Sequence, residues 1–371
     1  MSLAALTRYF LWLGATGFGG PIALVGYMQR DLVERRRWFG EREFAEALAL
    51  AQLAPGPLAA QVATYLGWLR GGLLGATATT VAFVVPSLAI VLVLAALYLQ
   101  AGELPWMRQS FYGVGAAVIA IIARSAVKLA RMTLGRDALA WGLWALNAVA
   151  VAATEREILW VIVGSGLVML AARERVAPVA AALAIPPWLL TGVHGPAAPD
   201  ELARIGAFFF KAGAVVFGSG LAIVPFLYGG VVAEYEWLDD RQFLDAVAVA
   251  MITPGPVVIT VAFVGHLAAG PLGGLVAAIG VFLPVWLAVV LAAPFFSRLV
   301  ASARVRAFVG GVTAAAAGAI AGAAVVLGRR AITDLTTLWI AAGALALLLA
   351  WRRLPEPALV AVAGVIGLVL A

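Results

Sequence analysis

Long apolar stretches separated by short charged connections make up most of this chain. They cover about residues 4–29, 72–100, 108–130, 137–153, 157–172, 205–232, 271–297, 305–328, 333–350 and 355–371. A helix needs roughly 20 apolar residues to cross the hydrocarbon core of a bilayer. The pattern therefore predicts an all-α polytopic membrane protein, with five spanning helices in each half of the chain.

Two further apolar segments, at about 43–69 and 242–269, are interrupted in the middle by Pro-Gly-Pro. Each half of such a segment is a helix of about 16–20 Å, which is shorter than an apolar core of about 30 Å. Proline lacks a backbone N–H and ends the preceding helix. These segments are predicted to be re-entrant helical hairpins or broken helices.

The second half of the chain repeats the first. The same residues recur in the same order at a constant offset, among them Phe18 with Phe217, Trp38 with Trp237 and both Pro-Gly-Pro triplets. Repeats of this kind indicate two copies of one structural unit. We expect an N-terminal membrane repeat at 1–175, an interfacial linker at 176–199 and a C-terminal membrane repeat at 200–371.

Charges in the connecting loops indicate that the two repeats are inverted relative to each other. The loop "RDLVERRRWFGER" is rich in arginine, whereas its counterpart "AEYEWLDDR" is mostly acidic. Arginine-rich loops stay in the cytoplasm, so the two loops are expected on opposite sides of the membrane. If 4–29 and 205–232 are single spanning helices, Arg8 lies outside and Arg204 inside.

Composition narrows the functional classes. The chain is 64% hydrophobic and 12% charged, with a mean hydropathy of +1.03. It has no cysteine and two histidines, so no disulfide, metal or other cofactor is expected. The net charge of +6 does not indicate nucleic acid, because membrane proteins collect Lys and Arg in cytoplasmic loops. No cleavage site follows the first apolar stretch, which is expected to be a retained membrane helix.

The Pro-Gly-Pro breaks predict a substrate site. Non-helical backbone at membrane depth is tolerated only inside protein or beside an aqueous cavity, and the free N–H groups of a helix N-terminus bind anions. A glycine cluster in the first apolar stretch of each half adds further backbone amides. The expected substrate-binding residues are Gly19, Gly20, Pro55, Gly56, Pro57, Gly218, Ser219, Gly220, Thr253, Pro254, Gly255 and Pro256.

These motifs resemble a known family. "FGGP" followed by "RRRWFGEREFAEALALAQLAPGP", and the second copy "FFFKAGAVVFGSG" with "WLDDRQFLDAVAVAMITPGP", are similar to the chromate ion transporter (CHR) family in its long two-domain form. The resemblance covers essentially the whole chain. It implies efflux of chromate from the cytoplasm of bacteria or archaea, resistance to chromate, and transport driven by the proton-motive force.

Three ionisable residues in apolar segments are candidates for the mechanism. Lys211 matches the basic position of the family motif and is expected to attract the dianion; the alternative is that it snorkels to the interface. Glu46 and Asp245 occupy equivalent positions before the two breaks and are proton-coupling candidates. Their alternative role is at a wet helix start, where the helix dipole favours a carboxylate.

The sequence leaves several functions open. Chromate is the first expectation, and sulfate or another tetrahedral oxyanion carried by the same architecture is the alternative. An integral-membrane enzyme acting on lipid phosphates would need a clustered catalytic set, which the scattered carboxylates and scarce histidines do not supply. A passive anion pore would lack proton dependence. We expect a multi-pass protein of the inner membrane, embedded in the lipid bilayer, with protons as a coupling partner and a homodimer as a possible assembly.

Overall fold

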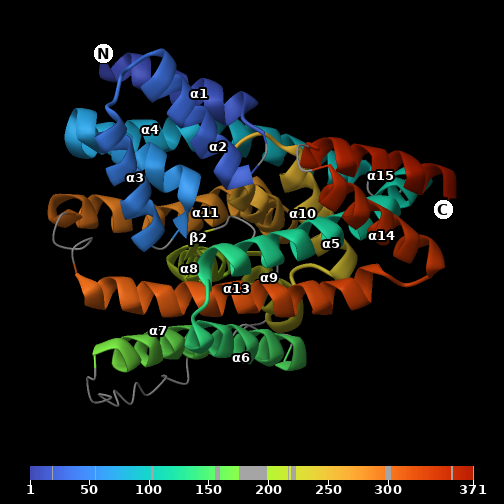
Figure 1. Cartoon of the computed structure of the whole chain (residues 1–371). Coiled ribbons are helices and arrows are strands. Elements are labelled where there is room, and N and C mark those ends of the chain that lie inside the picture. Colours follow the sequence, from blue (N-terminus) through green and yellow to red (C-terminus); the bar gives the residue numbers. More distant parts are fainter. Residues whose placement is uncertain are drawn as a thin grey trace.

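A computed structural model describes residues 1–18, 20–54, 56–101, 104–154, 159–174, 199–215, 217–218, 223–296, 302–351 and 354–370. The fold is helical (Figure 1). The first half contains α1 (Leu3–Thr16), α2 (Gly20–Met28), the π-helical turn η1 (Gln29–Arg35), α3 (Glu41–Leu53), β1 (Gly56–Pro57), α4 (Leu58–Ala101), α5 (Pro105–Thr133), α6 (Ala138–Thr154) and α7 (Leu159–Glu174).

The helices of the second half follow the same order, whereas β2 lies at the glycine segment and not at the Pro-Gly-Pro break. It contains α8 (Pro199–Val215), β2 (Phe217–Gly218), α9 (Ile223–Tyr228), the π-helical turn η4 (Gly229–Glu234), α10 (Asp240–Ile252), the 3-10 turn η5 (Val257–Ile259), α11 (Thr260–Ala292), the 3-10 turn η6 (Ala293–Phe295), α13 (Ala303–Ala331), α14 (Leu335–Ala350) and α15 (Glu356–Leu370). The expected linker at 176–199 lies outside the described residues except for Pro199, which begins α8.

The apolar stretch at 4–29 is a hairpin, not the single spanning helix expected from the sequence. Its two arms are α1 and α2 with η1, and the chain leaves helical geometry at Gly17. Arg36, just after η1, lies 5.4 Å from the centroid of the Tyr9 ring in α1. The chain therefore returns along α1 after the break. Hydropathy cannot separate the two cases, because the run is long enough to span and its break is made of glycine.

The corresponding stretch at 205–232 folds in the same way. The indole N–H of Trp237, beyond η4, donates a hydrogen bond of 2.5 Å to Glu201 in the first turn of α8. The Phe208 ring also packs against the rings of Tyr235 and Trp237. The end of this segment thus lies beside its own beginning, and the expectation of one spanning helix is wrong here too.

The Pro-Gly-Pro segments form the second hairpin of each half. The guanidinium of Arg70 donates to the carbonyl of Trp38 and lies 4.6 Å from the Phe39 ring centroid. The arm that ends at Arg70 has therefore come back to the face where α3 begins. Gly71 and Gly72 then turn the chain, with Gly72 at φ 54° and ψ −137°. After this turn α4 continues across the molecule.

Long apolar helices complete each half. Four of the described helices are long and apolar enough to cross a bilayer: Leu58–Gln100, Pro105–Arg131, Val257–Phe295 and Ala303–Ala331. The shorter apolar helices α6, α7, α14 and α15 pack against α5 and α13. Small residues permit close contact, since a Cβ on Gly113 would lie 2.0 Å from the Ala363 carbonyl oxygen and one on Gly318 would lie 2.1 Å from the Trp144 carbonyl oxygen.

The two halves are inverted, as the loop charges predict. Leu3 lies beside Gly71, so α1 starts at the face where Arg70 lies. From there α4 runs to the other face, where the Tyr98 hydroxyl donates a hydrogen bond to Asp245. On that second face Asp240, at the start of α10, pairs with Arg330 at 2.6 Å. The hairpins of the two halves therefore enter from opposite faces.

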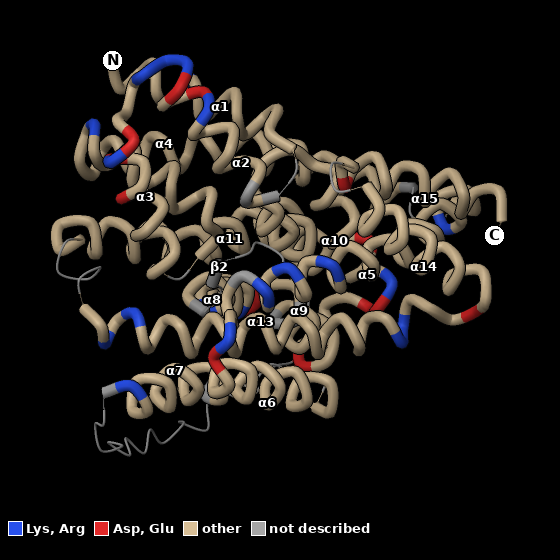
Figure 2. Tube along the Cα trace, in the orientation of Figure 1, with Lys and Arg blue, Asp and Glu red and all other residues tan. Residues whose placement is uncertain are grey.

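Charged residues mark these faces (Figure 2). α11 and the middle of α13 are free of coloured residues, whereas both ends of α13 and the segment around η1 carry charges. The arginine-rich face has Arg8, Arg35, Arg36, Arg37, Arg42, Arg70, Arg136, Arg173 and Arg304; the other has Arg108, Arg204, Arg241, Arg329 and Arg330. The positive-inside rule makes the arginine-rich face cytoplasmic. Arg8 and Arg204 each lie on the face opposite to the one expected, because of the unexpected hairpins.

Candidate functional site

The break of each half meets the glycine segment of the other half at the centre of the molecule. β1 pairs in parallel with β2, placing Gly56 opposite Phe217. In the reciprocal contact, the Gly255 amide donates a hydrogen bond of 2.7 Å to the Gly17 carbonyl. α10, α11 and β2 accordingly lie together in the middle of the view (Figure 1). Each half thus closes its break on backbone supplied by the other, and we call this region the crossing.

Both breaks require glycine. Gly56 has φ 129° and Gly255 has φ 98°, in the region that L side chains rarely adopt. A Cβ on Gly56 would lie 2.8 Å from a methyl carbon of Val285, and one on Gly255 would lie 1.9 Å from the Ser87 hydroxyl. Val285 lies in α11 and Ser87 in α4, so each glycine is contacted by a helix of the opposite half. The crossing is therefore packed too tightly for a side chain at either glycine.

Helix N-termini gather at the crossing. α4 begins directly after Pro57, and the turn η5 that leads into α11 begins directly after Pro256. Proline is favoured at such a start because the missing N–H has no helical partner to lose. The free amides and the positive end of the helix dipole favour an anion. The two helix starts therefore bring partial positive charge to the crossing.

The polar side chains beside the breaks support the backbone in this conformation. The Gln61 amide donates a hydrogen bond of 2.9 Å to the Ala54 carbonyl, which spans the first break. The Thr253 hydroxyl is buried and donates to the Val249 carbonyl at 2.7 Å. Of the expected site residues, Gly20 opens α2, Gly218 lies in β2 and Pro254 lies at the second break. Four others lie outside the described residues: Gly19, Pro55, Ser219 and Gly220.

Comparison with known proteins identifies the family. The sequence profile described as "Chromate transporter" matches residues 4–170 and 203–368, which is most of both halves. The chain belongs to the chromate transporter family. No solved structure matches it.

Relatives of this chromate transporter family member match it over nearly its full length. It is 52% identical to the "Chromate transport protein" of Cupriavidus metallidurans, over 99% of this chain and 93% of that protein. It is 51% identical to the "Probable chromate transport protein" of Synechococcus elongatus, over 99% and 95%. It is 32% identical to the "Chromate transport protein" of Pseudomonas aeruginosa, over 95% and 88%. With its apolar helices, the chain is a multi-pass protein of the plasma membrane, and its family points to transport and not catalysis.

The two equivalent carboxylates of this family member lie in different surroundings. Asp245 is 2% exposed and accepts a hydrogen bond of 2.6 Å from the Tyr98 hydroxyl, while Arg241 lies 3.9 Å away. Glu46 pairs at 3.2 Å with Arg42, whose side chain is 93% exposed. Asp245 is thus enclosed between helices of both halves, whereas Glu46 belongs to a surface ion pair.

Lys211 lies on α8, one helical turn before the helix ends at Val215. Its side chain is exposed, whereas the side of α8 that packs on α11 presents Phe209 and Ala212. The structure therefore brings Lys211 near the end of the helix that leads to the crossing, but does not place its ammonium among the buried contacts there.

Two residues of the site were not singled out from the sequence. Ser87 is buried and donates a hydrogen bond of 3.1 Å to the Gly14 carbonyl, next to Gly255. Tyr98 supplies the hydroxyl that contacts Asp245. Pro86 and Pro284 occupy corresponding places in the two repeats, and Ser87 follows the first where Val285 follows the second, so the sequence contains a signal for Ser87. In the sequence alone, Tyr98 cannot be distinguished from other aromatic residues at the ends of apolar stretches, so no signal points to its contact with Asp245.

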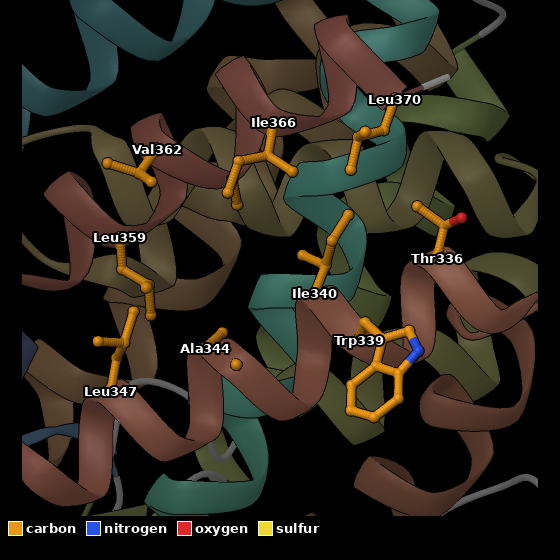
Figure 3. Close-up of a pocket in the computed structure, with 11 residues that line it drawn as sticks. Thr336, Trp339, Ile340, Ala344, Leu347, Leu359, Val362, Ile366 and Leu370 are labelled. Atoms are coloured by element: carbon orange, nitrogen blue, oxygen red, sulfur yellow. The ribbon is translucent and has the colours of Figure 1, made fainter.

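A separate groove of about 410 Å³ lies between α14 and α15 (Figure 3). Leu347, Leu359 and Val362 line one end and Trp339 the other, and Thr336 is the only side chain with a hydroxyl in its lining. An apolar groove of this kind cannot stabilise a dianion. It is therefore not the substrate site.

Metal ligands are likewise not assembled in the described part of the chain, where no three His, Asp or Glu side chains cluster as a metal site would require. His266 is buried in α11 among apolar neighbours. The chemistry available at the crossing is that of backbone amides and hydroxyls, and the buried carboxylate of Asp245 lies farther along α10.

Proposed function

We propose that this protein exports chromate from the cytoplasm in exchange for protons, and that the crossing holds the anion. The observation that carries the proposal is the reciprocal contact of each break with the glycine segment of the other half. Inverted repeats with broken helices at the membrane centre are a recurring plan of transporters. The substrate comes from the relatives, which are named as chromate transport proteins.

Binding would rely on backbone amides more than on a fixed cation. The helix starts after Pro57 and Pro256 supply partial positive charge from both halves. A tetrahedral dianion offers several oxygen acceptors that can use both sets of amides at once. Lys211 would then act through its charge, raising the local concentration of anions near the end of α8 without touching the substrate.

Asp245 is the proposed proton carrier. It is buried on α10, close to the face opposite the arginine-rich one, and Tyr98 from the first half donates to it. Burial disfavours a charged carboxylate, and a hydroxyl donor favours it, so the contact with Tyr98 depends on whether the proton is present. Because α10 leads directly into Thr253 and the second break, a change at Asp245 reaches the crossing through one helix.

Movement of the substrate would require the crossing to open toward each face in turn. The strand pairing and the Gly255 to Gly17 hydrogen bond join the two halves at the centre, while α6 and α7 pack on α13, and α14 and α15 on α5. Breaking and remaking the central contacts while one group of helices moves against another would give alternating access. The same contacts would keep the two faces from being open together.

The test is transport by the purified protein in proteoliposomes loaded with chromate, with an inward proton gradient applied. We expect chromate efflux that the gradient accelerates and that unlabelled chromate inhibits more strongly than sulfate. Equal or stronger inhibition by sulfate would assign the site to sulfate or oxyanions in general. An efflux rate that is the same with and without the proton gradient would contradict the exchange mechanism and support a passive pore.

A further inference from the structure

A second cavity lies away from the crossing, on the arginine-rich face. It has a volume of about 580 Å³ and lies between α1 and the segment that includes η1. Its lining includes Arg8, Trp12, Asp31, Arg35, Arg36 and Trp38. The volume is in the range of cavities that hold small ligands. We call it the basic cavity.

The charges in this cavity do not cancel. Asp31 is the only acidic residue in the lining, and it is already engaged by Arg30 at 3.1 Å and Arg35 at 3.7 Å. Arg8 and Arg36 form no ion pair with any residue that the structure describes. The lining is therefore prepared for an anion that the protein does not itself supply.

Aromatic rings hold one of these arginines in place. The Arg36 guanidinium carbon lies 4.7 Å from the Trp38 ring centroid and 5.4 Å from that of Tyr9. Such cation–π contacts fix the direction of a guanidinium while leaving its N–H groups available. A guanidinium fixed in this way loses little freedom when it binds a phosphate group.

The second half shows that the cavity is not a by-product of the repeated fold. At the equivalent place Phe208 occupies the position of Tyr9, and Tyr235 that of Arg36. Tyr235 stacks on Trp237 with ring centroids 4.6 Å apart, and Phe208 packs against both. The copy on the opposite face is thus filled with rings, and Glu201 accepts the indole N–H there. Where the cytoplasmic copy presents Arg36 to the cavity, the other copy presents the Tyr235 ring to its neighbours.

We infer that the basic cavity binds the phosphate headgroup of an anionic phospholipid from the cytoplasmic leaflet. Trp12 is 52% exposed and Leu11 is 47% exposed on the outer side of α1, one turn deeper than Arg8. The cavity therefore joins an arginine rim to an apolar surface that acyl chains can cover. The cytoplasmic leaflet carries the negative surface charge, and basic cavities on that side suit lipid headgroups.

The experiment measures lipid adducts on the intact purified protein by native mass spectrometry, with phosphatidylglycerol and phosphatidylcholine compared. The variant R8Q/R36Q removes the two unpaired arginines. R131Q/R136Q is the matched control, because it removes the same charge from exposed positions on the same face. We expect phosphatidylglycerol binding to weaken about fivefold for each cavity arginine lost, and to be unchanged in the control.

A second measurement separates lipid binding from misfolding and from capture of a free anion. In phosphatidylcholine, R8Q/R36Q should unfold at the same temperature as the unaltered protein, and only the unaltered protein and the control should gain stability from phosphatidylglycerol. Equal phosphatidylglycerol binding by R8Q/R36Q and the control would overturn the inference. Displacement of the lipid by millimolar inorganic phosphate would also overturn it, because the cavity would then take any phosphate.

Discussion

Asp245 and Glu46 show at the level of single residues that the two repeats have diverged. Their backbone positions are equivalent, yet one carboxylate is enclosed beside Tyr98 and the other lies in a surface pair with Arg42. The sequence places both carboxylates before the breaks, because it shows how many residues separate each of them from its Pro-Gly-Pro. It could not show which carboxylate is buried, because burial depends on Tyr98, which comes from a distant helix of the other repeat.

We expect Asp245→Asn to uncouple transport from protons. The amide keeps an oxygen that can accept the Tyr98 hydrogen bond, but it cannot carry a proton. Efflux driven by a proton gradient should fall to the rate seen without a gradient, while chromate exchange at equal pH continues. Glu46→Gln should leave the gradient response intact, because exposed ion pairs contribute less than about 1 kcal/mol. Gradient-driven efflux by Asp245→Asn would remove this residue from the proton path.

Gly255→Ala should damage the crossing itself. Its positive φ costs an alanine about 1–3 kcal/mol, and the added Cβ would meet the Ser87 hydroxyl at 1.9 Å. Thermal unfolding in detergent should show the loss of stability, and chromate efflux should be abolished. Gly142→Ala in α6 is the control, because a Cβ there meets nothing within 4 Å. Equal behaviour of the two variants would mean that the break tolerates side chains.

At the scale of elements, the hairpins divide into those that the sequence reveals and those that it hides. Proline marks the second hairpin of each half, since it must end a helix. The first hairpin breaks at glycines, which helices in membranes also use for close packing. An apolar run of spanning length with internal glycines therefore has the pattern of one helix, and its return is visible only in tertiary contacts such as those of Arg36 with Tyr9 and of Trp237 with Glu201.

Arg70 is expected to hold the second hairpin of the first half closed. It contacts the Trp38 carbonyl, Glu43 and the Phe39 ring, thereby joining the returning arm to the start of α3. Arg70→Gln should lower the free energy of unfolding by about 1.5–3 kcal/mol, the range for a hydrogen bond from a charged group. Arg42→Gln should cost less than about 1 kcal/mol, because its pair with Glu46 is exposed. Hydrogen exchange should locate the loosening in α3; a uniform change would contradict the local role.

At the scale of the whole molecule, the inversion of the two halves determines where each copy of a repeated hairpin lies and what it contacts. Because the halves enter from opposite faces, each Pro-Gly-Pro can meet the glycine segment of the other at mid-depth. The same inversion places one copy of the first hairpin in the cytoplasmic leaflet, with a basic cavity, and the other copy outside, where aromatic rings pack together. Repeats and loop charges were enough to predict the inversion. The crosswise contacts were not predictable from them, since they depend on the depth at which each hairpin turns.

Single cysteines test this topology directly, because the chain has none of its own. We expect Arg8→Cys and Arg37→Cys to react with a membrane-impermeant thiol reagent from the cytoplasmic side, and Glu236→Cys to react from the outside; all three positions are exposed. Inside-out and right-side-out vesicles supply the two orientations. If 4–29 were one spanning helix, Arg8→Cys and Arg37→Cys would react on opposite sides, which would refute the first hairpin. Reaction of Arg37→Cys and Glu236→Cys on one side would refute the inversion, and with it the crossing as a site shared by both halves.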